Sequence, residues 1–132
     1  MMDIQEREKL VAAWVRSAQE ELDLAHELHI SKRYTHCLFF CQLALEKLLK
    51  ALIVKKQNTY PLPIHKLARL AKIAGIELTE KQTEDLNEIT TFNIEARYDI
   101  LKEQLYKKAD SIFTEKYLNS TKSLFTYLIS LI

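Results

Sequence analysis

The sequence predicts an all-α fold, an antiparallel up-down bundle of four long helices plus one short helix, as a single domain over residues 1–132. Of these residues 48% are hydrophobic, so the chain can bury a core and is not a disordered linker. One glycine and two prolines are too few for a sheet with many tight turns. Apolar residues recur at steps of three and four, as on one face of a helix. Long helices with short connections then favour antiparallel neighbours.

The first two expected helices supply most of the apolar surface. The first covers about residues 4–29 and ends at Ser31, which we expect to cap the helix that follows. The second covers about residues 32–56 and is apolar over more than half of its circumference. We therefore predict a homodimer, because one bundle core cannot cover that much apolar surface.

A loop and a short helix are expected next. Two prolines within residues 58–63 break the helical pattern, and a short helix follows over about residues 65–74. His65 most simply opens that helix. Gly75, the only glycine, stands where a helix C-cap requires a positive φ.

The last part of the chain contains two further long helices. Thr79 and Gln82 have the spacing of a capping box, which predicts a helix from there to about residue 98. Residues 99–108 fit either a linker or an early start of the terminal helix, which is expected from about residue 109. The inward stripes of these two helices are expected to include Ile94 and Ile112.

Charge and missing motifs exclude several classes of protein. A formal net charge of +1 provides no global field toward nucleic acid or a membrane. Neither a membrane helix nor an apolar signal-peptide core is recognisable, so we expect a cytoplasmic protein without membrane contact. No glycine-rich phosphate loop or other cofactor or metal motif is present, and we expect neither cofactor nor metal.

Cys37 and Cys41 are expected as small core residues without a disulfide. A metal pair completed by His36 is the alternative.

Polar residues inside the apolar second helix are the first candidates for a binding site. Glu46 and Lys50 stand four apart with the acid first, the favourable order for a helical ion pair. Gln42 and Lys47 accompany them. One interpretation is a polar cleft where amide, carboxylate and ammonium groups converge on a ligand. The alternative is an ion pair on a solvated face, which contributes little.

Arg97 and Tyr98 form the second group of candidates, near the end of the helix that begins at Thr79. A guanidinium beside a phenol suits phosphate binding and base stacking. The alternative is a local salt bridge from Arg97 to Glu95 or Asp99, or a surface position.

Residues 34–51 carry a resemblance to a known family. Their Gln, Ala, Glu-Lys and Lys-Ala at fixed spacing resemble the apolar helix of the HEPN family, the higher eukaryote and prokaryote nucleotide-binding domain. The resemblance spans nearly the whole chain. Its other matching positions are Trp14 in the first helix, Pro61, Pro63 and His65 in the loop, and Arg97-Tyr98 at the family's Arg-Tyr-Pro element, with Asp99 in place of the proline.

The resemblance implies a bundle of four or five helices that is usually dimeric. Many members are encoded beside a small nucleotidyltransferase and act with it, often as a toxin–antitoxin pair. Some members are metal-independent ribonucleases, whose signature is an Arg followed by four to six residues and then a His. The His transfers the ribose-hydroxyl proton, and the Arg stabilises the phosphorane charge. In this chain Lys102, Glu103 and Gln104 occupy the positions of that His after Arg97.

We therefore expect a non-catalytic nucleotide- or RNA-binding module, a homodimer that acts with a small nucleotidyltransferase in a toxin–antitoxin system. One alternative is a divergent metal-independent ribonuclease toxin with Arg97 and His65, or His36, as catalytic residues. A second is a purely structural bundle whose polar residues fix helix register and the dimer. The ligand-binding residues of the expected cleft are Glu46, Lys47, Lys50, Arg97 and Tyr98.

Overall fold

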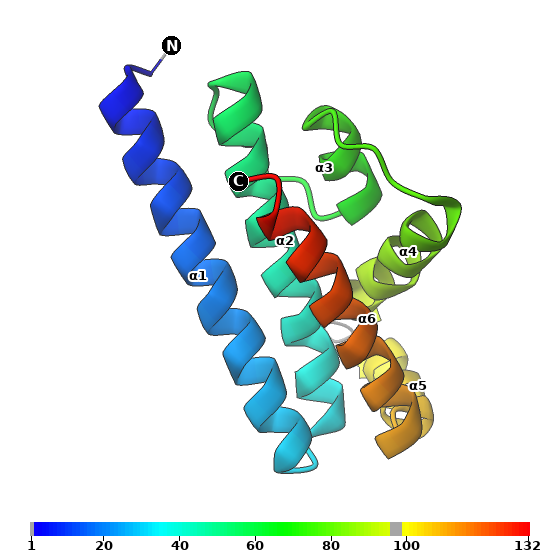
Figure 1. Cartoon of the computed structure of the whole chain (residues 1–132). Helices are drawn as coiled ribbons and strands as arrows, with labels where there is room; N and C mark the ends of the chain where they lie inside the picture. Colours follow the sequence, from blue (N-terminus) through cyan, green and yellow to red (C-terminus); the bar gives the residue numbers. More distant parts are fainter. Residues whose placement is uncertain (1, 96–98) are drawn as a thin grey trace.

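The computed structural model describes residues 2–95 and 99–132, and within these ranges it contains helices and no strand (Figure 1). The all-α prediction is confirmed. Residues 99–108, which the sequence left between linker and helix, form a helix of their own. The helices are α1 (Ile4–Ile30), α2 (Tyr34–Gln57), α3 (Leu67–Ile73), α4 (Glu80–Glu95), α5 (Asp99–Lys108) and α6 (Ser111–Ile129).

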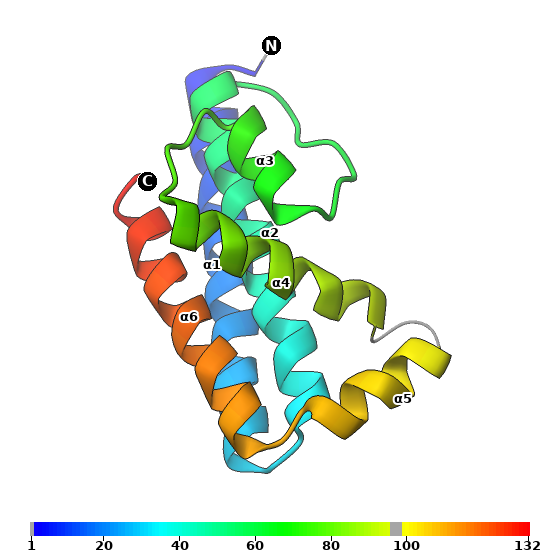
Figure 2. The same cartoon turned by 90° about the vertical axis from the view of Figure 1, so that its right-hand side faces the viewer.

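The long helices α1, α2 and α6 lie side by side, and α1 runs antiparallel to the other two (Figure 1). Helix α4 crosses α2 at a steep angle, and α3 lies on the same side of α2 (Figure 2). The up-down arrangement thus describes α1, α2 and α6, whereas α4 spans the bundle. None of the described helices combines the length and apolar composition of a membrane-spanning segment.

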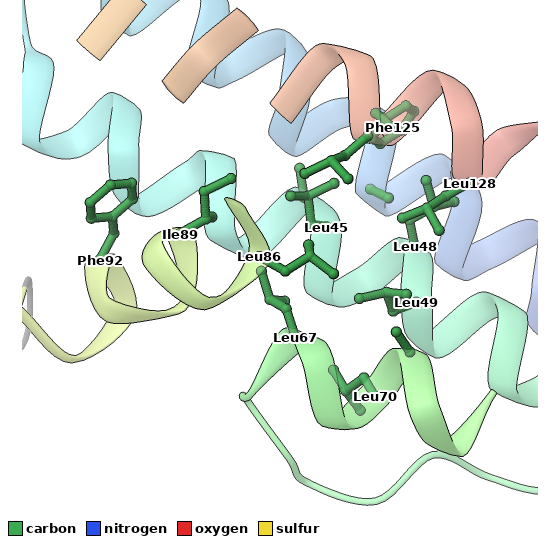
Figure 3. Close-up of a cluster of buried hydrophobic side chains, with 14 of the residues drawn as sticks. Leu45, Leu48, Leu49, Leu67, Leu70, Leu86, Ile89, Phe92, Phe125 and Leu128 are labelled. Carbon is green, nitrogen blue, oxygen red and sulfur yellow. The ribbon is translucent and has the colours of Figure 1, made fainter. Parts of the chain in front are cut away.

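Helix α2 is the centre of the core. Fifteen of its 24 residues are buried, because α1, α3, α4 and α6 all pack against it. Leucines of α2 meet side chains of α3, α4 and α6 in one cluster (Figure 3). A single chain therefore covers most of this helix, and Phe39, Phe40 and Leu43 are left half-buried. The homodimer itself stays a prediction.

Two expected helix ends are confirmed in detail. Gly75 has a φ of 70°, the left-handed conformation that glycine adopts without strain. Thr79 and Gln82 form the reciprocal capping box: the Gln82 amide donates to Thr79 Oγ1 at 3.1 Å, and the Thr79 amide donates to Gln82 Oε1 at 2.9 Å. These caps fix how α4 enters the bundle.

Two other expectations about helix ends are wrong. Ser31 does not cap α2: its hydroxyl donates back to the Leu28 carbonyl at 3.2 Å and closes α1, while Arg33 precedes α2 without a side-chain cap. His65 does not open α3, which begins at Leu67. His65 stays in the preceding loop because its ring is engaged by α2, as described below.

Two apolar residues that we expected in the core are on the surface. Ile112 is 81% exposed, because it shares a helix face with the exposed Lys116 and Asn119, one and two turns later. Ile94 is 47% exposed, since the core-facing side of α4 is completed by the preceding Phe92 and Asn93.

Candidate functional site

An ion pair lies inside the bundle at the middle of α2. Glu46 is 5% exposed and Lys50 is 7% exposed. Lys50 Nζ donates to Glu46 Oε2 at 3.1 Å across one helical turn. The predicted pair is therefore formed, and it is buried instead of lying on a solvated face.

Three further polar side chains converge on this pair. His65 Nδ1 lies 2.9 Å from Glu46 Oε1, and Gln42 Nε2 donates to the same oxygen at 3.0 Å. Gln42 Nε2 also approaches the His65 carbonyl oxygen at 3.3 Å, and Gln42 Oε1 accepts from Asn93 Nδ2 at 3.0 Å. We call these residues the α2 network: Gln42, Glu46, Lys50, His65 and Asn93.

The helical repeat explains why the network forms. Gln42, Glu46 and Lys50 follow one another at steps of four, so their side chains form a row along one side of α2. Helix α4 brings Asn93 to one end of the row. The Leu67 amide donates to Thr90 Oγ1 at 3.1 Å, which attaches the start of α3 to α4 and places the loop carrying His65 over the row.

Electrostatics keep the Glu46 carboxylate ionised. Burial by itself would raise its pKa, but hydrogen bonds from Gln42 and His65 and the charge of Lys50 outweigh burial, so the pKa lies below its usual value of 4.5. Both carboxylate oxygens are occupied by donors. The acid therefore acts as an anchor for its neighbours.

The donors of the network retain capacity for a ligand. An ammonium group carries three N–H bonds, and Lys50 donates to Glu46 and also lies 5.8 Å from the centroid of the Trp14 ring. The His65 side chain is 48% exposed, with Nε2 on the side of the ring away from Glu46. A group of donors around a fixed carboxylate suits an anionic ligand better than a cationic one.

Lys47 is not brought to the network. Its Nζ donates to Ser17 Oγ at 2.7 Å and to Glu21 Oε1 at 3.1 Å, both on α1. One residue from Glu46, the helical repeat turns this side chain toward α1. The structure thus separates Lys47 from Glu46 and Lys50.

Arg97 and Tyr98 lie outside the described residues. The network nevertheless extends to Asn93, four residues earlier in the chain. Sequence reasoning missed Asn93, which is 3% exposed. A signal was available: Asn93 follows Leu86 and Ile89 at helical spacing, so a polar residue stands at a core-facing position.

His36 lies far from the network, in the first turn of α2. Ten helical residues separate it from Glu46, about 15 Å along the axis.

His36 is exposed, whereas Cys37 and Cys41 are buried and unoxidised. A hydrogen bond with Cys41, together with burial, raises the pKa of Cys37 far above its ordinary range, so this thiol stays protonated. Within residues 2–95 and 99–132 no cluster of three metal-ligating side chains occurs.

Comparisons with known proteins agree with this architecture. The family model of the HEPN domain matches residues 11–130. The crystal structure of TT1696 from Thermus thermophilus has a similar fold, with a TM-score of 0.79 at 16% sequence identity over 92% of this chain and 98% of that one. No curated protein matches the sequence significantly. At this identity the structural similarity establishes the fold.

Proposed function

The chain belongs to the HEPN domain family, and from this premise we propose that it is a nucleotide- or RNA-binding module that catalyses no reaction of its own. The α2 network is the observation that carries the proposal. In it, one ionised and buried carboxylate holds the ammonium of Lys50 and the ring of His65 in fixed positions. Preorganised donors of this kind bind a phosphate group with little loss of side-chain entropy.

Stability alone is a weak reason for such a network. A buried ion pair pays a desolvation cost that often equals its Coulomb attraction, and apolar residues of similar volume are commonly as stable. Ionisable groups with perturbed pKa values are also enriched at functional sites. The lowered pKa of Glu46 in a helix that is otherwise apolar therefore favours a binding role.

In the proposed site Arg97 and Tyr98 complete the ligand contacts that Lys50 and His65 begin. Arginine binds phosphate oxygens through two parallel hydrogen bonds, and a tyrosine ring stacks on a base. Glu46 positions the donors. We leave Lys47 out of the ligand contacts because its ammonium is engaged by α1.

A titration of the purified protein with ATP and with a short RNA, followed by calorimetry, tests this site. We expect Arg97→Ala and Lys50→Met each to weaken binding by about tenfold or more, the loss of one charge-assisted contact. Arg69→Ala, at an exposed position of α3, is the matched control and should leave affinity unchanged. If Arg97→Ala and Lys50→Met bind both probes as tightly as the control does, the proposed site is wrong.

We further propose that the homodimer forms through the side of α1 and α2 that carries Trp14, Leu24, Phe39 and Leu43. These apolar side chains are only half-buried, and they lie outside the two core clusters. Leu43→Glu should turn a dimer into a monomer in light scattering. Leu62→Glu is the control, because Leu62 is 60% exposed in the loop before α3. Equal masses for both variants would contradict this interface.

The proposed partner is a small nucleotidyltransferase in a toxin–antitoxin system, and family membership supports it. We expect the neighbouring gene to encode such an enzyme. Co-expression should then yield a stoichiometric complex and should relieve any growth arrest caused by this chain alone. Failure of a neighbouring nucleotidyltransferase to co-purify under these conditions would remove this part of the proposal.

A divergent metal-independent ribonuclease is the second candidate, and the contact between His65 and Glu46 favours it over a use of His36. A carboxylate at Nδ1 fixes the tautomer in which Nε2 is free to accept a proton. In that reaction His65 would take the proton of a ribose hydroxyl while Arg97 stabilised the phosphorane charge. Expression would be toxic, and His65→Ala would relieve the toxicity. Harmless expression with intact cellular RNA would exclude this candidate.

A further inference from the structure

A hollow of about 630 Å³ lies at the start of α2, whereas the α2 network lies at the middle of that helix. It is enclosed by the turn between α1 and α2, by α5 and by the start of α6, which meet at the lower end of the molecule in Figure 2. We call it the α2–α5 hollow. Its volume is within the range of small-molecule sites. The lining residues that matter here are Lys32, Arg33, Thr35, His36, Lys102 and Tyr106.

The charge of the hollow is positive. Lys32, Arg33 and Lys102 contribute three permanent cations, against one carboxylate from Asp110. In the described part of the chain none of these three cations forms an ion pair. Asp110 Oδ1 already accepts from the Phe113 amide at 2.8 Å and caps α6. The excess of unpaired cations thus faces an open hollow and attracts an anion.

The first turn of α2 adds backbone donors to these side chains. The first amides of a helix have no partner within it. Here Arg33 at the cap position provides no side-chain acceptor, and the first turn contains no acidic residue. Most of that turn lines the hollow. A phosphate at this position would accept from these amides and would interact favourably with the helix dipole.

Thr35 provides a second, independent sign of a ligand. It lines the hollow, yet it is only 8% exposed. Its hydroxyl has no hydrogen-bond partner among residues 2–95 and 99–132. The hydroxyl of this mostly buried side chain is therefore free to bind a ligand oxygen in the hollow that it lines.

Tyr106 gives the hollow an aromatic wall. It follows Lys102 by one helical turn, so the ring and the ammonium share one face of α5. Tyr106 is 74% exposed, which packing in the bundle does not explain. A ring beside a cation is the combination that binds a base next to its phosphate.

We propose that the α2–α5 hollow binds a 5′-phosphate monoester carried by a nucleoside, with the phosphate at the start of α2 and the base against Tyr106. Lys102, Arg33 and the Thr35 hydroxyl bind the phosphate oxygens. The inference is independent of the α2 network, because the hollow is lined by other residues and lies at the start of α2. A free mononucleotide and the 5′ end of an RNA strand share this chemistry.

Amide chemical shifts of the full-length protein, labelled with 15N, locate each binding event. The probes are inorganic phosphate, AMP, and an adenosine trinucleotide with a 5′-phosphate or a 5′-hydroxyl. We expect phosphate and AMP to shift the amides of residues 34–36. Lys102→Ala should raise the Kd for phosphate and for AMP by about tenfold, whereas Tyr106→Ala should weaken AMP alone.

Matched variants separate this site from nonspecific attraction and from the proposed site at Lys50. Lys9→Ala removes one exposed cation from α1 and should change neither Kd. The double variant Glu46→Leu with Lys50→Met removes both charges of the buried pair without leaving one unpaired, and it should leave the phosphate-induced shifts of residues 34–36 intact. Thr35→Val keeps the shape of Thr35 and should weaken phosphate binding. AMP and the 5′-phosphorylated trinucleotide should both bind, and their relative Kd values distinguish a free nucleotide from an RNA end. Equal Kd values for Lys102→Ala and Lys9→Ala, or equal binding of both trinucleotides, would overturn the proposal.

Discussion

The α2 network lies at the middle of α2 and the α2–α5 hollow at its start, and the charges of the two regions are arranged in opposite ways. In the network, an acid and a base are both more than nine-tenths buried, and each carboxylate oxygen accepts a hydrogen bond. In the hollow, three cations line an open space and none of them has an ionic partner among the described residues. The charges of the network are therefore bound to one another inside the core, whereas those of the hollow face solvent.

This difference separates stability from binding. Buried charges depend on one another, so removing one partner leaves the other desolvated and unpaired. Exposed cations interact mainly with water, and removing one changes the free energy of unfolding little. Substitutions in the network should therefore lower the free energy of unfolding as well as change binding, whereas substitutions in the hollow should change binding alone.

The largest effect is expected for Glu46→Ala, which leaves Lys50 buried without its carboxylate. We expect the free energy of unfolding to fall by about 3 kcal/mol or more, measured by urea denaturation. Asp85→Ala is a matched control, because Lys81 and Asp85 form an ion pair at the same helical spacing with Lys81 69% exposed. The control should lose about 0.5 kcal/mol.

A double variant distinguishes loss of charge balance from loss of packing. Glu46→Leu with Lys50→Met removes both charges and keeps most of the volume. It should recover most of the stability lost in Glu46→Ala, since no uncompensated charge remains. If the double variant is as unstable as Glu46→Ala, the ion pair is not the main source of the loss, and the contrast with the hollow fails.

The second expected effect is a pH dependence of the free energy of unfolding. The pKa of Glu46 is lower in the folded chain than in the unfolded one, so its contribution is present above the unfolded value of about 4.5 and is lost as pH falls through the folded value. Glu46→Gln cannot titrate. The stability gap between the natural protein and Glu46→Gln should therefore narrow from pH 7 to pH 3 in urea denaturation. A gap of constant size would contradict the lowered pKa.

The sequence was sufficient for the helices and for the ion pair, but not for the surroundings of the pair. Glu46 and Lys50 were predictable because a helical repeat of four is a local property. The contact of His65 with Glu46 and that of Asn93 with Gln42 were not predictable, because each joins segments at least 19 residues apart. These contacts depend on the crossing of α4 and on the path of a loop. Local spacing carries no information on that crossing.

The same distinction explains the remaining differences. Lys47 looked like part of the candidate cleft because it is adjacent to Glu46, but the partner that engages it, Glu21, is on another helix. The hollow went unpredicted for a similar reason. Its cations are 69 residues apart in the chain from Arg33 to Lys102, and only the packing of α5 against the start of α2 brings them together.

The third expected effect concerns an ion pair that is less buried than Glu46–Lys50 and less exposed than Lys81–Asp85. Lys47 and Glu21 are 21% and 17% exposed at their side chains, and Lys47 also donates to Ser17. Lys47→Met should cost about 1 kcal/mol in urea denaturation, more than an exposed pair and less than the network. A loss as large as that of Glu46→Ala would show that burial does not set the order of these effects.

The smallest effect on stability is expected in the hollow. Lys102 is exposed on α5 and alanine is a good helix former, so Lys102→Ala should change the free energy of unfolding by less than about 0.5 kcal/mol. The same substitution is expected to weaken phosphate binding about tenfold. Urea denaturation and phosphate titration of this one variant therefore test whether the hollow contributes to binding without contributing to stability. If Lys102→Ala loses stability in proportion to its loss of phosphate binding, the hollow stabilises the fold as the network does, and the contrast between the start and the middle of α2 is wrong.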